Sequence, residues 1–305
     1  MENRWWTYQR ERFPLFKHGI LILAFSAAAL TYSRLLRGEL TFFDLQTYTV
    51  AFATALTYFM QLRIADEFKD FEEDSRYRPY RAVPRGLIKL RELGWVFVGC
   101  SLIQVSLAYW LYPKLIVLLL VTWLYLAGMS HEFFVRDWLK ARPITYLWTH
   151  MLIMPLVDLY ITSCDWMVSG MTSPPNGIVW FLVVSFFNGV LLEFGRKMRA
   201  PEDEETGVET YTFLWGIKRA TFAWLFALSL NFFAALMAAL NSGNFVFTSL
   251  LLAIPFLAGV RIGLSFRGQP DLKRASLVEN FSGLWTLAMY LALGPIALAY
   301  HIWIK

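Results

Sequence analysis

Nine long apolar stretches run along this chain of 305 residues, each close to the roughly 20 residues that a helix needs to cross a bilayer. They lie at about 16–35, 45–65, 93–112, 114–135, 144–164, 177–195, 219–240, 244–264 and 281–304. The chain is 57% hydrophobic, which is too apolar for an ordinary soluble domain. We therefore expect one all-α domain over residues 1–305, an integral membrane bundle of nine transmembrane helices.

The first stretch contains the small residues FSAAAL, which resemble a signal-peptide cleavage site. The apolar stretch is too long for a signal peptide, and Arg34 and Arg37 follow it as they follow the end of a helix. We expect a retained span.

Lys and Arg are distributed unevenly between the two ends of the expected helices. The N-terminal tail and the loops after the second, fourth, sixth and eighth stretches hold 24 of the 28 basic residues. Because basic loops stay in the cytoplasm, we expect a multi-pass protein of the cell (inner) membrane with a cytoplasmic N-terminus and its C-terminus on the opposite side. Two charged loops, at about 63–91 and 193–218, then lie on the cytoplasmic side.

The first charged loop has regularly spaced acids. Asp66, Asp70 and Asp74 lie at i, i+4 and i+8. Residues four apart in a helix are offset by only about 40° around its axis, so all three would share one face. Unpaired like charges at this spacing destabilise a helix, and a divalent cation would offset their repulsion. Oxygen ligands, with Glu67 beside them and no His or Cys nearby, favour Mg²⁺.

A basic run follows these acids, and its arginines (Arg78, Arg81 and Arg85) suit phosphate groups. Carboxylates for Mg²⁺ next to arginines for phosphate, at the edge of a membrane, indicate a lipid diphosphate. The alternative is a solvated loop with surface ion pairs, although the regular acid spacing at a helix end favours the metal. No block of the sequence is typical of a nucleic-acid-binding arm, so we expect membrane lipids as partners and no nucleic acid.

The second charged loop begins at the end of the sixth stretch. Glu193 lies there, and Arg196 and Lys197 are three and four residues further on, where they can pair with it. A carboxylate so close to an apolar segment is costly and favours a function. After Pro201 come four successive acids, at 202–205, of which at most two can face one metal; the alternative for them is a solvated acidic loop.

A few polar residues elsewhere have two interpretations. Asp158 and Asn188 either line a polar cavity or form hydrogen bonds between helices. The pair His131–Glu132 lacks a second His four residues later, so we expect an interface pair there rather than a metal site, and we expect His150 to be an interior histidine with satisfied hydrogen bonds.

With these residues the chain resembles the UbiA superfamily of intramembrane prenyltransferases. Asp66, Asp70 and Asp74 match its first motif, N-x-x-x-D-x-x-x-D, with Asp in place of Asn, and Arg81–Gly86 (RAVPRG) resembles its R-P-L-P-S-G run. The resemblance implies nine transmembrane helices. It also implies that two acidic motifs, after helices two and six, face a cytoplasmic cavity and bind a prenyl diphosphate through Mg²⁺.

The second family motif, D-x-x-x-D, is altered in this chain. Anchored on Gly207, its second Asp falls on Asp203 and its first on Arg199. Arginine does not bind Mg²⁺. Either Glu193 or Glu202 substitutes for the missing acid, or the site holds fewer metals and Arg199 contacts phosphate directly.

We predict a Mg²⁺-dependent enzyme that ionises a prenyl diphosphate and transfers the prenyl group to an unknown acceptor. The alternatives are a UbiA-type terpene cyclase without an acceptor, and a non-enzymatic transporter or lipid-binding protein. The predicted catalytic residues are Asp66, Asp70, Asp74 and Arg81; the predicted substrate-binding residues are Arg78, Arg81, Arg85, Asn188, Arg196, Lys197 and Arg199; the predicted metal ligands are Asp66, Glu67, Asp70, Asp74, Glu193 and Asp203.

Overall fold

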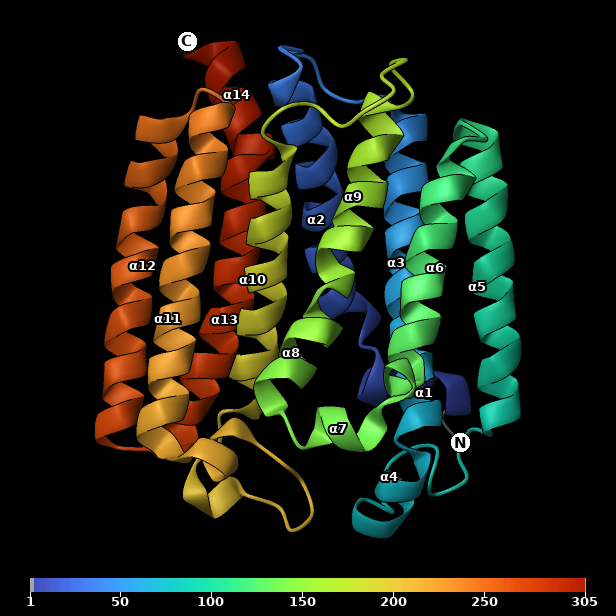
Figure 1. Ribbon diagram of the computed structural model, residues 1–305, viewed down its shortest axis with the longest axis vertical. Coiled ribbons are helices and arrows are strands. Elements are labelled where there is room, and N and C mark those ends of the chain that lie inside the picture. The colour runs from blue at the N-terminus through green and yellow to red at the C-terminus, as the bar shows by residue number, and fades with distance from the viewer. Residues whose placement is uncertain (1–2, 305) are drawn as a thin grey trace.

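The computed structural model describes residues 3–304, and every regular element in this part of the chain is helical. Figure 1 shows long helices standing side by side, with α1, α4 and α7 at one end of the bundle and α14 at the other. The elements are α1 (Arg4–Arg12), α2 (Leu15–Leu36), α3 (Leu45–Lys69), α4 (Phe71–Tyr77), α5 (Leu90–Leu111), α6 (Leu115–Ser130), η1 (Glu132–Phe134), α7 (Arg136–Lys140), α8 (Pro143–Met151), α9 (Ile153–Trp166), α10 (Ile178–Lys197), η2 (Pro201–Asp203), α11 (Tyr211–Asn241), α12 (Phe245–Gly268), α13 (Leu272–Leu293) and α14 (Pro295–Trp303).

Within residues 3–304, seven helical segments are long and apolar enough to cross a membrane. They are α2, α5, α8 with α9, α10, α11, α12, and α13 with α14. Two further expected spans correspond to helices outside this set: α6 is apolar but has only 16 residues, and α3 has 25 residues but ends in a charged turn. The all-α membrane bundle is thus confirmed, whereas the number nine remains a prediction.

Several boundaries differ from those that the apolar runs predict. α11 begins at Tyr211, eight residues before the expected start, where Thr210 accepts a hydrogen bond from the backbone N–H of Phe213. A kink at Gly216 (φ 74°, ψ 160°) separates this first part from the rest of the helix, which begins close to the expected start. The expected fourth span continues to about 135, but α6 ends at Ser130. The expected ninth span begins near 281, but α13 begins at Leu272.

The centre of the bundle is built on α2. This helix packs against α3, α9, α13 and α14, and its small residues Ala28 and Ala29 are fully buried. Gly294, between α13 and α14, lies so close to α2 that a Cβ at this position would be 2.4 Å from the Cα of Ala28. Small residues at this crossing let the two backbones approach each other, as is common between membrane helices. With these contacts, α2 is an internal helix of the bundle.

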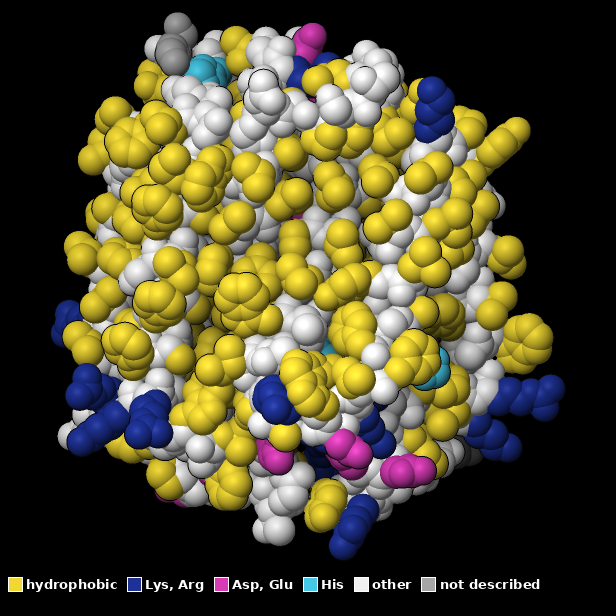
Figure 2. Space-filling model, in the orientation of Figure 1, with side chains coloured by type: hydrophobic (Ala, Val, Ile, Leu, Met, Phe, Trp, Pro, Cys, Tyr) yellow, Lys and Arg dark blue, Asp and Glu magenta, His cyan; other side chains and the backbone are white. Residues whose placement is uncertain are grey.

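α5 and α12 lie at the two sides of the bundle and keep most of their apolar surface exposed. Figure 2 shows that hydrophobic side chains cover the middle of the molecule, while Lys, Arg, Asp and Glu gather near the end that carries α4 and α7. An exposed apolar band of this kind fits the hydrocarbon core of a bilayer. The charged end of the bundle contains the candidate site.

Candidate functional site

A cavity of about 730 Å³ opens among the helix ends at this charged end of the bundle. Its lining comes from α1, α3, α4, α6 to α11 and the loops between them. Ten basic and seven acidic side chains line it, together with methionines and other apolar residues. This excess of positive charge, beside an apolar part, suits an amphiphile with an anionic head.

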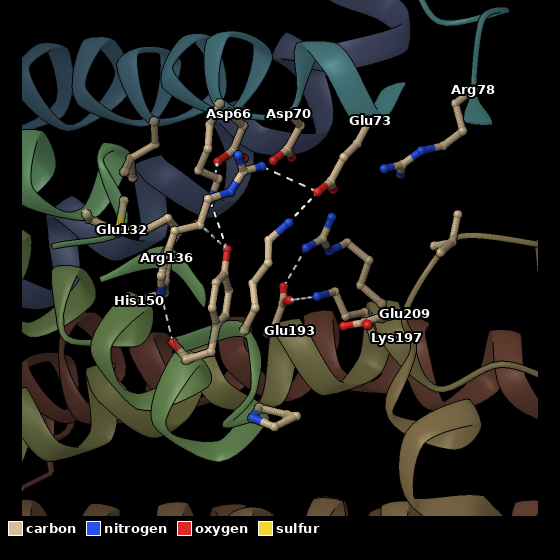
Figure 3. Close-up of a pocket in the computed structure, with 18 of the residues that line it drawn as sticks. Asp66, Asp70, Glu73, Arg78, Glu132, Arg136, His150, Glu193, Lys197 and Glu209 are labelled. Atoms are coloured by element: carbon tan, nitrogen blue, oxygen red, sulfur yellow. Dashed lines mark hydrogen bonds and ion pairs between the residues drawn. The ribbon is translucent and has the colours of Figure 1, made fainter. Parts of the chain in front are cut away.

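Asp66 and Asp70 project into the cavity from the end of α3 (Figure 3). Asp66 is near two cations, with Arg63 Nη2 at 3.5 Å and Lys69 Nζ at 3.9 Å. Asp70 forms no ion pair with any described residue. Burial raises the pKa of Asp70; the charge of Lys69 opposes this effect, and the carboxylates of Asp66 and Asp74 add to it. Asp66 and Asp70 therefore form an acidic part of a cavity wall that is otherwise mainly basic.

Asp74 does not share the face of Asp66 and Asp70, contrary to the prediction from spacing. α3 ends at Lys69, and Asp70 has φ −96° and ψ 4°, so the helix is interrupted before α4 begins. Asp74 is 1% exposed and contacts Arg78 Nη2 at 2.7 Å and Arg81 Nη1 at 2.6 Å. It orients two arginines that line the cavity and does not line the cavity itself.

Glu67 also lies outside the cavity lining, although it was predicted as a metal ligand. Its side chain is buried, accepts a hydrogen bond from Arg12 Nε at 2.5 Å, and lies 3.6 Å from Arg63 Nε. Glu67 therefore holds α1 against α3, and this packing was not visible in the spacing of the acids.

The facing wall of the cavity is the end of α10 (Figure 3). Here Glu193 binds Arg196 Nη2 at 2.6 Å and Lys197 Nζ at 3.0 Å, as the i, i+3 and i, i+4 spacing predicts. All three residues line the cavity. Because its carboxylate already holds two cations, Glu193 presents a basic surface and does not offer a free metal ligand.

A third group of charges joins α4 to α7 across the cavity. Glu73 forms an ion pair with Lys140 and lies 3.4 Å from Arg136 Nη2. The hydrogen bond from Lys140 lowers the pKa of Glu73, against an opposing effect of burial. Arg136 and Lys140 therefore add two cations to the basic side of the cavity, and sequence reasoning had assigned neither of them a role.

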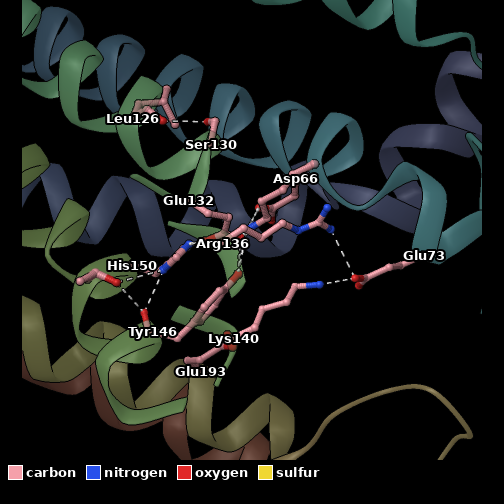
Figure 4. A network of polar contacts seen from close by, with 12 residues as sticks. Asp66, Glu73, Leu126, Ser130, Glu132, Arg136, Lys140, Tyr146, His150 and Glu193 are labelled. Atoms are coloured by element: carbon pink, nitrogen blue, oxygen red, sulfur yellow. Dashed lines mark hydrogen bonds and ion pairs between the residues drawn. The ribbon is translucent and has the colours of Figure 1, made fainter. Parts of the chain in front are cut away.

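Sequence reasoning also missed a buried polar cluster in the wall of the cavity. Glu132 follows α6, Tyr146 and His150 lie one turn apart on α8, and Lys69 ends α3. Tyr146 accepts a hydrogen bond from Lys69 Nζ at 3.0 Å and donates one to Glu132 Oε1 at 3.0 Å (Figure 4). His150 Nε2 lies 3.1 Å from Glu132 Oε2. The expected interface pair of His131 and Glu132 is therefore wrong for Glu132, because its partners are Lys69, Tyr146 and His150.

The electrostatics of Glu132 keep it ionised. Burial by itself would raise the pKa of Glu132, but the hydrogen bond with His150 and the charge of Lys69 outweigh burial and lower the pKa to about 2. A depressed carboxyl pKa stabilises the folded state above the unfolded pKa, and this stability is lost only as the pH falls through about 2. Glu132 is thus a carboxylate throughout the physiological range.

Four other predicted site residues lie outside the cavity lining: Arg85, Asn188, Arg199 and Asp203. Asn188 is buried and accepts a hydrogen bond from Asn231 at 3.2 Å, which links α10 to α11. Arg199 binds Glu205 Oε1 at 3.0 Å on the outside of the second loop. The geometry therefore does not support direct contact of these residues with a substrate in this cavity.

The two charged loops touch each other at the rim of the cavity. Gly207, at φ 79°, lies against the ring of Tyr77, and a Cβ at this position would be 2.5 Å from a ring carbon. Tyr80 donates a hydrogen bond to Glu205 Oε2 at 3.3 Å. Gly207 therefore allows the close approach of the second loop to α4, which closes one side of the cavity.

The acidic residues fit one small metal ion better than two. Among residues 3–304, no group of three or more His, Cys, Asp and Glu is arranged to hold a metal ion. Mg²⁺, however, commonly takes one or two carboxylates and completes its coordination with water and substrate phosphate. Asp66 and Asp70 can supply those two carboxylates, and the unpaired charge of Asp70 suits a cation.

Comparisons with known proteins agree with this architecture. A sequence model described as the UbiA prenyltransferase family matches residues 20–281. Among solved structures, a UbiA homologue from Aeropyrum pernix K1 in its apo form matches with a TM-score of 0.67 at 15% identity, over 93% of this chain and 98% of the other. A digeranylgeranylglyceryl phosphate synthase matches with a TM-score of 0.61 at 16% identity, over 93% and 99%. Curated protein sequences give no match.

Proposed function

The chain belongs to the UbiA prenyltransferase family, and we propose that it is a Mg²⁺-dependent membrane enzyme that ionises a prenyl diphosphate and transfers the prenyl group to an acceptor. The observation that carries this proposal is the arrangement of charges in the cavity. Asp66 and Asp70 face the basic end of α10 across one space, and Arg136 and Lys140 line the same space. A diphosphate between these walls has carboxylates for its metal on one side and cations on the other.

Asp66 and Asp70 would hold one Mg²⁺, which supplies positive charge to the leaving diphosphate when it is bound. The side chains of Arg196, Lys197, Arg136 and Lys140 would bind the remaining phosphate oxygens and stabilise the charge that develops as the carbon–oxygen bond breaks. Arg78 and Arg81, oriented by Asp74, would add to this stabilisation. In this proposal the cations on α10 and α7 do the work that a second metal would do, and Arg199 has no part in it.

The apolar part of the cavity suits the prenyl chain. Met129, Met151 and Met154 line it, and Gly189 lets the last two approach α10, because a Cβ there would be 2.8 Å from Met154 Cγ. Flexible methionines adapt to an apolar ligand. They would also keep water from the cation that forms, since water would capture it.

The proposal is tested by incubating the purified protein in detergent with Mg²⁺ and farnesyl or geranylgeranyl diphosphate, and by measuring diphosphate release and the prenyl products. We expect release that requires Mg²⁺. Release of cyclic or linear hydrocarbon without an acceptor would indicate the cyclase alternative. No release from any prenyl diphosphate, with or without added membrane lipid extract as a source of acceptor, would contradict the proposal.

A further inference from the structure

The proposed function assigns no role to Glu132, Tyr146, His150 and Lys69, although all four residues line the cavity. Glu132 is 3% exposed and His150 is 7% exposed. A buried carboxylate and a buried histidine at the edge of a membrane are costly, and such groups are usually kept for a function.

The backbone that carries Glu132 is strained. Glu132, Phe133 and Phe134 have φ values of 51°, 50° and 61°, a left-handed conformation that non-glycine residues rarely adopt. Backbone strain of this kind is costly and concentrates at functional sites. Here the strained turn places the carboxylate of Glu132 against Tyr146 and His150, which come from another helix.

The hydrogen bonds of the cluster have a definite direction. The backbone carbonyl of Tyr146 only accepts, so His150 Nδ1, at 2.8 Å from this oxygen, must donate. The ammonium group of Lys69 can only donate hydrogen bonds, so it donates to the Tyr146 hydroxyl. The hydroxyl must therefore direct its own proton to Glu132 Oε1, at 3.0 Å. The ring of His150 stacks on that of Tyr146 with centroids 3.9 Å apart, which fixes both side chains.

We propose that Tyr146 and Glu132 form the proton-accepting site of this enzyme, in which the Tyr146 hydroxyl takes up the proton released by the reaction and passes its own proton to Glu132. The inference rests on the proposed prenyl transfer and adds a route for a proton to it. His150 and Lys69 are positioning residues in this site, since they orient Glu132 and the hydroxyl.

The bond between the allylic carbon and the diphosphate oxygen breaks, and both of its electrons leave with the diphosphate. The allylic cation then forms a bond to an oxygen or carbon of the acceptor, and the acceptor gives up one proton. That proton passes to the Tyr146 oxygen, and the hydroxyl proton passes to Glu132 Oε1. Glu132, whose pKa is about 2 at rest, then returns the proton to water when the product leaves.

Two conservative variants test this route. Tyr146→Phe keeps the ring that stacks on His150 but removes the hydroxyl. Glu132→Gln keeps an oxygen that can accept the hydrogen bond of Tyr146, but the amide cannot take up a proton. Tyr125→Phe is the matched control, because Tyr125 donates to the backbone of Thr149 at 2.7 Å and does not line the cavity.

Each variant is compared with the parent in thermal unfolding, in binding of inorganic pyrophosphate with Mg²⁺, and in formation of prenyl products other than the free alcohol from farnesyl or geranylgeranyl diphosphate. For Tyr146→Phe and Glu132→Gln we expect unchanged unfolding and pyrophosphate binding, and product formation lowered by about 10²- to 10⁴-fold, the usual contribution of a general base. Tyr125→Phe is expected to behave like the parent.

Three results would overturn the assignment. If both variants form product at the parental rate, only the proton route is wrong. If both variants bind pyrophosphate more weakly or unfold at a lower temperature, and this loss accounts for the loss of product formation, the cluster is structural. If the parent releases no diphosphate from either compound, the proposed function fails, and the proton route fails with it.

Discussion

The acidic side chains around the cavity differ in the cations that they already hold. Glu67, Asp74, Glu73 and Glu193 each form at least one close ion pair with Lys or Arg. Asp70 forms none with the described residues, and the nearest cations to Asp66 are at 3.5 and 3.9 Å. Ion pairing therefore makes Glu67, Asp74, Glu73 and Glu193 poor candidates for metal ligands, although three of them lie in the predicted ligand set.

At the scale of single residues, Asp74→Ala should destabilise the folded protein. The change would leave Arg78 and Arg81 without the buried carboxylate that lies 2.7 and 2.6 Å from them. Removing one partner of a buried ion pair costs about 3–5 kcal/mol. Unfolding in detergent by heat or denaturant measures the effect, with Asp137→Ala on the exposed side of α7 as the control. Equal stability of the two variants would show that Asp74 does not orient these arginines.

Lys197→Ala and Arg199→Ala separate the two possible cations of the second loop. Lys197 lines the cavity, whereas Arg199 binds Glu205 outside it. Loss of a charge-assisted contact of about 1.5–3 kcal/mol would weaken pyrophosphate binding by roughly 10- to 100-fold in Lys197→Ala. Arg199→Ala should bind like the parent. The reverse result, measured by calorimetry with Mg²⁺, would restore the arginine contact that the altered family motif suggests.

At the scale of elements, the site depends on where helices end. α3 stops one residue before Asp70, α6 stops before the strained turn of Glu132, and α10 ends on the basic group of Arg196 and Lys197. Helix ends from distant parts of the sequence meet there because α2, α9, α10 and α13 pack tightly in the interior. The packing of helices thus determines the positions of the charges.

The crossing of α2 with the end of α13 tests this dependence. In Gly294→Ala the new Cβ would lie 2.4 Å from the backbone of Ala28, so the helices must separate, at a cost of about 1–3 kcal/mol. Gly283→Ala, on the same α13, is the matched control because no atom lies within 4 Å of the added Cβ. We expect the Tm in detergent to fall for Gly294→Ala and to stay equal or rise for Gly283→Ala. A fall of equal size in both variants would contradict the close approach of these helices.

At the scale of the whole molecule, the charged residues gather at one end of an apolar bundle. The cavity opens at this end, which also carries α1, α4 and α7, while α14 lies at the opposite end. The distribution of Lys and Arg predicts that this end faces the cytoplasm.

A reporter fused after Lys305 should therefore be found outside the cytoplasm, and a reporter inserted near Gly268 should be found inside. Gly268 is the last residue of α12, and the loop after it is one of the Lys- and Arg-rich loops expected in the cytoplasm. Lys305 follows α14 in the sequence. Protease accessibility or a compartment-specific reporter enzyme measures both positions. Both reporters on the same side would show that the number of spans between them is not odd.

The apolar runs were sufficient to predict the membrane bundle, because each long helix leaves a long apolar run in the sequence. Helix ends were harder to predict: α11 begins with a mixed polar turn, and the break at Gly294 was missed although Pro295 follows it. Of the site, the i, i+4 spacing of Asp66 and Asp70 and the pairing of Glu193 could be read from local spacing.

The rest of the site arises from tertiary contacts that no local pattern reveals. Glu132 and His150 are 18 residues apart in sequence, and Lys69 comes from another helix. A signal was present, since Tyr146 and His150 lie four residues apart and therefore on one face of α8, but nothing in the sequence showed that Glu132 would meet this face. Asp74 was misplaced for a related reason, because the break in the helix at Asp70 is not visible in the spacing of the acids.

The central claim, a diphosphate site that uses Mg²⁺ on Asp66 and Asp70, is tested most directly by binding of inorganic pyrophosphate across a Mg²⁺ titration. The parent should bind more tightly as Mg²⁺ rises and lose this gain in excess chelator. Asp66→Ala and Asp70→Ala should stay folded but lose the dependence on Mg²⁺, while Asp137→Ala keeps it. If Asp70→Ala binds pyrophosphate with the same affinity and the same response to Mg²⁺ as the parent, the assignment of the metal to these carboxylates is wrong.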